Sequence, residues 1–151
     1  MIKNVLTLTL TLSVGLLSLA AHAQMSPVGL WRSIDDVTLQ PKAEIRIVQK
    51  AGGGLSGLVE RSLVTTPNSE PNCNLCSDDR KDQPKIGMEI IRGGQQSDGK
   101  AVWEGGKILD PENGKIYSLR LTPIDGGKKL EVRGFIGLPL LGRTQNWIRV
   151  Q

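Results

Sequence analysis

Apolar and polar residues alternate along short segments of this chain, which is the pattern of strands with one buried and one solvated face. Ile45 and Ile47, for example, flank the polar Arg46. No long segment shows the spacing of apolar residues that is typical of a helix. The alternation predicts eight strands, over Val28–Ile34, Ala43–Lys50, Leu55–Val64, Ile86–Arg92, Lys100–Leu109, Lys115–Thr122, Lys129–Ile136 and Arg143–Val150.

Turn-forming sequences join several of these segments. Three of them supply the glycines and the proline that tight hairpins need. These are Lys50–Gly54 (KAGGG), Asp110–Gly114 (DPENG) and Asp125–Lys129 (DGGKK). A row of hairpins with one apolar face hides its edges by closing into a barrel or by folding into a sandwich. Because the hairpins are consecutive, we expect an all-β fold, a single antiparallel up-and-down barrel of eight strands.

The first residues have a different character from the rest. Lys3 precedes an apolar stretch from Val5 to Leu19, which ends in the small-residue pattern Ala21-His22-Ala23. This is the pattern of a cleavable secretory signal peptide, and the apolar stretch is short for a spanning helix. We therefore expect a signal peptide over residues 1–23 and a mature barrel domain over residues 24–151. The mature protein would be periplasmic or secreted, without stable insertion in a membrane.

Charge and composition exclude several classes of function. The chain has a net charge of +4, but its cations are scattered among acidic residues and its aromatic content is 3%, so nucleic-acid binding is not expected. Its single histidine, His22, would leave with the signal peptide. Catalytic arrangements of Ser-His-Asp or Cys-His and imidazole zinc sites are then unavailable. We expect no enzyme, no cofactor and no metal.

The segment Thr65–Lys85 lacks apolar periodicity and is long enough to indicate a functional or cross-linked loop. It contains Cys73 and Cys76. Two cysteines cannot complete a zinc site alone, and a thioredoxin-like pair would need a helix N-terminus, whereas acidic residues follow here. In an exported chain we therefore expect a local disulfide. The nearby acids Asp78 and Asp79 alternate with cations, as in a solvated loop.

The chain also resembles known proteins. The first strand carries Gly29-Leu30-Trp31, and the last strand carries Arg149. This combination is similar to the lipocalin pattern, in which the tryptophan packs across the closed end of the barrel under the arginine. Three longer segments resemble a bacterial family of small exported proteins labelled domain of unknown function 2147. They are CNLCSDDRKDQPKIGMEII, WEGGKILDPENGKIYSLRL and LEVRGFIGLPLLGRTQNWIRV. The resemblance implies a lipocalin-like barrel closed by Gly29, Trp31 and Arg149, with no established activity.

An eight-stranded barrel is just wide enough to be filled by side chains or to hold one small molecule. We expect aliphatic side chains to line a cavity, in which Gly57, Gly105 and Gly134 leave gaps. Our first hypothesis is a binder of a small, largely apolar molecule, lipid-like with an anionic head that Arg or Lys would meet at the rim. The alternative is an envelope interaction module with a filled barrel, whose long loop contacts a protein partner. The candidate ligand-lining residues are Ile47, Val59, Met88, Leu119 and Val132.

Overall fold

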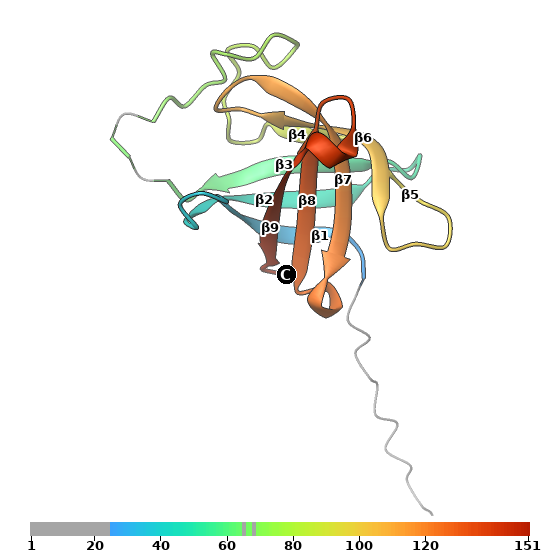
Figure 1. Ribbon diagram of the computed structural model, residues 1–151. Helices are drawn as coiled ribbons and strands as arrows, with labels where there is room; N and C mark the ends of the chain where they lie inside the picture. The colour runs from blue at the N-terminus through green and yellow to red at the C-terminus, as the bar shows by residue number, and fades with distance from the viewer. Residues whose placement is uncertain (1–24, 65, 68) are drawn as a thin grey trace, which may run out of the picture.

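The computed structural model describes residues 25–151, apart from residues 65 and 68. The predicted signal peptide and its cleavage site lie outside the described residues. The domain is built of antiparallel strands with two short 3-10 turns (Figure 1). The strands are β1 (Gly29–Ile34), β2 (Pro41–Gln49), β3 (Leu55–Ser62), β4 (Glu89–Arg92), β5 (Gln95–Gln96), β6 (Trp103–Asp110), β7 (Lys115–Ile124), β8 (Lys129–Phe135) and β9 (Arg143–Arg149).

Eight of these strands form a closed barrel. Each barrel strand pairs with the next barrel strand along the chain, so that β4 pairs with β6 through Ile91 and Ile108, and β9 returns to pair with β1. The predicted all-β, up-and-down barrel is therefore confirmed. Strand β5 was not predicted. It has two residues, pairs only with the start of β6, and lies beside the barrel wall.

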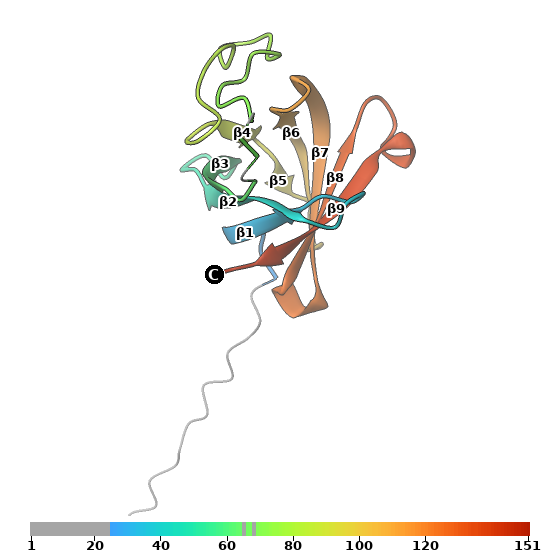
Figure 2. The same ribbon diagram turned by 90° about the vertical axis from the view of Figure 1, so that its left-hand side faces the viewer.

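The connections alternate between the two ends of the barrel, as an up-and-down topology requires. The links β1–β2, β3–β4, β6–β7 and β8–β9 lie at one end, which we call the mouth. The links β2–β3 and β7–β8 lie at the other, which we call the closed end, together with the start of β1 and the end of β9. Figure 2 shows the long β3–β4 loop and the β6–β7 turn at the end opposite the β7–β8 turn.

The predicted turns occupy the hairpins for the expected reason. Gly53, Gly114 and Gly126 all have positive φ angles, of 83°, 70° and 62°. Such angles are accessible to glycine without steric penalty. The turn chemistry of the sequence therefore sets the positions of three hairpins correctly.

The two faces of the wall are also as the alternation predicts. Ile45, Ile47, Leu121 and Leu130 are buried inside the barrel. On the outer face, polar side chains pair across strands, as in the ion pair of Arg46 Nε with Glu60 Oε1 at 2.8 Å. Among the described residues, no helix has the length and apolar character needed to cross a membrane.

Candidate functional site

Trp31 and Arg149 meet at the closed end. The Trp31 ring is completely buried, its Nε1 donates to the Pro27 carbonyl at 2.7 Å, and the Arg149 guanidinium lies 4.1 Å from the ring centroid. Arg149 also donates to the carbonyl oxygens of Val28 at 2.9 Å and Ser26 at 2.7 Å. The guanidinium thus ties the last strand to the segment leading into the first.

Gly29 makes this arrangement sterically feasible. Its φ is +143°, and a Cβ atom there would lie 2.5 Å from Arg149 Nη1 and 2.6 Å from the Gln151 carbonyl oxygen. A side chain at position 29 would therefore displace the arginine from the tryptophan. This contact gives a physical reason for the Gly-x-Trp spacing.

The mouth half of the barrel is hollow. A cavity of about 950 Å³ opens between the four mouth connections, while the closed half is packed with core side chains. The buried part of the cavity wall is mostly apolar, whereas each charged lining residue is half-buried or exposed. The buried wall contains Ile45, Val59, Ile90, Leu109, Val132 and Trp147.

Of the five residues expected to line a ligand site, Val59 and Val132 lie on the cavity wall. Ile47, Met88 and Leu119 are buried but do not line it, so this part of the expectation is corrected. The alternation of apolar and polar residues shows that a side chain points inward. It does not show how far that side chain lies from the mouth along the barrel axis. Ile47 and Leu119 lie nearer the closed end than the lining residues of their own strands, Ile45 and Tyr117. Met88 precedes β4 and packs in the core, and the lining residue there is Ile90.

The glycines expected to leave gaps behave differently from one another. Gly134 lines the cavity. The space beside Gly57 is taken by Ile91, whose Cβ would lie 2.8 Å from a Cβ at Gly57, and Gly105 is exposed. Trp147 was not expected in the lining, although its inward position follows from the alternation of β9.

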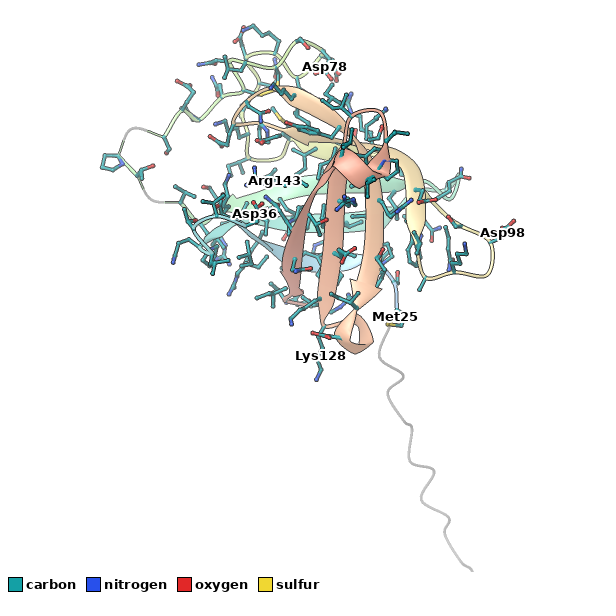
Figure 3. The ribbon with its side chains drawn as sticks, in the orientation of Figure 1. Met25, Asp36, Asp78, Asp98, Lys128 and Arg143 are labelled. Atoms are coloured by element: carbon teal, nitrogen blue, oxygen red, sulfur yellow. A yellow bond between two sulfur atoms is a disulfide. The ribbon has the colours of Figure 1, made fainter. Side chains whose placement is uncertain are left out.

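Ion pairs tie the mouth connections to one another. Arg143 at the start of β9 pairs with Asp36 in the β1–β2 link, as Figure 3 shows, and Lys85 Nζ lies 3.0 Å from Glu112 Oε1 across the β3–β4 and β6–β7 links. The hydrogen bonds from Arg143 lower the pKa of the Asp36 carboxyl. The rim thus carries acids and cations that are already matched to each other.

The predicted disulfide between Cys73 and Cys76 is confirmed. It lies in the long loop at the mouth, where Cys73 Sγ is 3.5 Å from the Pro111 carbonyl oxygen. The loop packs so closely on the β6–β7 turn that a Cβ atom at Gly114 would lie 1.9 Å from the Leu75 carbonyl oxygen. The disulfide therefore shapes a loop that rests directly on the neighbouring hairpin.

The acids after the cysteines anchor this loop to β4. Arg80 is buried, binds the Asp78 carboxylate through Nη2 at 2.6 Å, and donates through Nη1 to the Glu89 carbonyl at 2.9 Å. Hydrogen bonding from Arg80 lowers the pKa of Asp78 to about 2. Arg92 holds both oxygens of Asp79 at 2.8 Å. The expectation of a solvated loop is therefore wrong for Arg80, which packs as an internal anchor.

Because many contacts hold this loop, it should survive loss of its cross-link. Replacing both Cys73 and Cys76 with serine should leave the barrel folded and lower its free energy of unfolding by about 2 kcal/mol or less, since the disulfide closes a very small ring. Urea unfolding followed by circular dichroism would measure this. Complete unfolding of the double variant in buffer would contradict a local role.

Among the described residues, no group of three or more His, Cys, Asp or Glu side chains is placed to hold a metal ion. The grouping that the structure does offer is an apolar cavity with a charged rim. Such a site can enclose a small molecule and orient its polar end toward solvent.

Comparison with known proteins agrees with the barrel architecture. The solved structure of protein HP1028 from the human pathogen Helicobacter pylori, described as belonging to the lipocalin family, is similar with a TM-score of 0.67 and 15% identity, over 82% of this chain and 82% of that chain. At this identity the likeness shows the fold. No curated protein matches the sequence. Residues 29–149 match a bacterial family described as "Uncharacterized protein conserved in bacteria (DUF2147)", and the chain therefore belongs to that family.

Proposed function

We propose that this protein is an exported, non-enzymatic carrier that holds one small, largely apolar molecule in the mouth half of its barrel. The observation that carries the proposal is the cavity of about 950 Å³ with its buried aliphatic wall. This volume lies within the range of roughly 300–1,000 Å³ that is usual for small-molecule sites. The lipocalin-like fold supports a binding function rather than a catalytic one.

The wall favours a flexible aliphatic chain over a flat ring system. Most of the buried lining consists of Ile, Leu and Val, and the aromatic rings that reach the cavity come from Tyr117, Phe135 and Trp147. An acyl or isoprenoid chain can fill such an irregular space. A polar head would remain at the rim, near Lys42, Lys85 and Arg143. The hollow interior favours this function over an interaction module with a filled barrel.

Export is part of the same proposal. A disulfide such as Cys73–Cys76 is typical of oxidising compartments outside the cytosol. Together with the signal-peptide pattern over residues 1–23, it supports a periplasmic or secreted protein whose mature domain spans residues 24–151.

Titration with dansylaminoundecanoic acid, a fluorescent fatty-acid probe, tests the cavity. We expect saturable binding by the wild type at micromolar concentrations and binding weaker by at least about tenfold for Val132→Trp, because the added indole occupies the apolar space. Glu131→Trp is the matched control, since the neighbouring position points to the outer face of β8. A dansylated undecanol in parallel measures the contribution of the anionic head.

The outcomes separate the two hypotheses. Equal affinity for Val132→Trp and Glu131→Trp would place the probe outside the barrel. Absence of saturable binding to the wild type would contradict the carrier function and favour the alternative of a protein-interaction module.

A further inference from the structure

Exposed aliphatic side chains gather on the connections at the mouth. Single exposed aliphatic residues are common on protein surfaces, but their concentration at one end of a molecule indicates an interaction surface. We name this set the apolar rim. It consists of Val37, Leu39, Ile86, Ile136, Leu138 and Leu140, which are all more than half exposed.

The β8–β9 link, residues 136–142, is the most apolar part of this rim. Leu138 is 66% exposed and Leu140 is 85% exposed. The link makes internal contacts, because Pro139–Leu141 forms a 3-10 turn and Arg133 reaches it from β8. An apolar loop that is held by such contacts loses less conformational entropy when it binds a surface.

Arg133 also satisfies the polar backbone of the link. Its Nε donates to the Pro139 carbonyl at 2.7 Å and its Nη2 to the Leu140 carbonyl at 3.1 Å. The Leu138 carbonyl accepts from Leu141 N at 3.1 Å. Three successive carbonyl groups thus have partners within the protein. This is the condition for placing irregular backbone against hydrocarbon, where water cannot supply hydrogen bonds.

The charges of the rim indicate which kind of surface it meets. Each cation that lines the cavity has an acidic partner: Lys42 with Asp35, Lys85 with Glu112, and Arg143 with Asp36. Such a rim carries no excess of positive charge to attract an anionic bilayer. Because its charges are paired as neutral couples, the rim suits a surface without net charge, such as a layer of zwitterionic headgroups.

We propose that the apolar rim docks reversibly on a zwitterionic phospholipid bilayer, with the mouth facing the lipid and the barrel outside it. Leu138 and Leu140 then lie at the boundary between headgroups and acyl chains, as apolar anchors of peripheral proteins do. A dimer formed mouth to mouth would block access to the cavity. A bilayer instead presents apolar acyl chains to the mouth. The proposal of docking is based on the apolar rim alone. Transfer of a lipid chain into the cavity would in addition require the proposed function to be correct.

Flotation with vesicles of phosphatidylcholine and phosphatidylethanolamine tests the docking. The wild type should float with these vesicles, and added phosphatidylglycerol should not strengthen the association. The double variant Leu138→Ser/Leu140→Ser should associate at least roughly tenfold more weakly, because two leucines lose their apolar burial. The matched control is Val48→Ser/Ile148→Ser, which changes exposed aliphatic residues on the outer wall away from the mouth.

Neither Leu138 nor Leu140 lines the cavity. Binding of dansylaminoundecanoic acid in vesicle-free solution should therefore be unchanged in the rim variant, and circular dichroism should show the same fold. If the protein binds vesicles but not the probe, the carrier function is contradicted and the docking is supported. If it binds the probe but not vesicles, only the docking is contradicted.

Three results would overturn the docking. These are a wild type that does not float, a control variant that loses as much binding as the rim variant, or a wild-type dimer in sedimentation that the rim substitutions dissociate. The last result would assign the rim to a second copy of the chain.

Discussion

Replacing Trp31 with alanine should lower the free energy of unfolding by about 3 to 5 kcal/mol, the range for large aromatic residues removed from a core. The indole is completely buried, and its removal would leave a cavity beneath the Arg149 guanidinium and free the Pro27 carbonyl of its partner. Equilibrium unfolding in urea, followed by far-ultraviolet circular dichroism, would give the difference. The other two tryptophans would still report on tertiary structure by fluorescence.

Arg149→Met separates the contribution of packing from that of the guanidinium. Methionine keeps an apolar stem over the indole but cannot donate to the Val28 and Ser26 carbonyls. We expect a loss that is measurable but smaller than that of Trp31→Ala. A loss below about 1 kcal/mol for Trp31→Ala, the level of an ordinary surface change, would remove the argument that this residue closes the barrel.

Replacing Gly114 with alanine should loosen the disulfide loop and expose the Cys73–Cys76 bond to reductant. The new Cβ would lie 1.9 Å from the Leu75 carbonyl oxygen and 2.9 Å from the backbone nitrogen of Cys76, so the loop must move away from the β6–β7 turn. We expect reduction by dithiothreitol to be faster by roughly tenfold or more, since access of the thiolate to the disulfide limits this exchange.

Gly99→Ala is the matched control for this experiment. Gly99 has nearly the same positive φ, +67° against +70°, but a Cβ there meets no atom within 4 Å. Both variants therefore carry the same backbone strain, while only Gly114→Ala carries the steric clash. Equal reduction rates in the two variants would show that the loop does not rest on the turn. Thiol alkylation and mass spectrometry at timed intervals would measure the rates.

Local rules of the sequence predicted the barrel well. The alternation placed Ile45 and Ile47 inside and Arg46 outside, and the glycines of three turns marked their hairpins correctly. These features depend on residues close together in the chain. The two-residue strand β5 was missed because Gln95 and Gln96 carry no apolar pattern.

The cavity was harder to predict because its position depends on height within the barrel. Ile45 and Ile47 both point inward from β2, yet only Ile45 reaches the hollow half. The loop contacts were also beyond local rules. Arg80 stands in a run of charges that is typical of an exposed loop, and only the fold brings it against the Glu89 carbonyl.

The pairing of β1 with β9 also bears on how the chain reaches this structure. Arg149 donates to the Val28 carbonyl, which is 121 residues away in the sequence, and so joins the last strand to the segment before the first. Bringing such distant segments together costs conformational entropy before any contact between them compensates for the loss. Proteins rich in contacts between distant segments, such as β-barrels, therefore fold slowly. The hairpins β2–β3, β6–β7 and β7–β8 can form early from local contacts. We therefore expect the seam between the first and last strands to assemble last, and until it forms both edges are open to pairing with other chains.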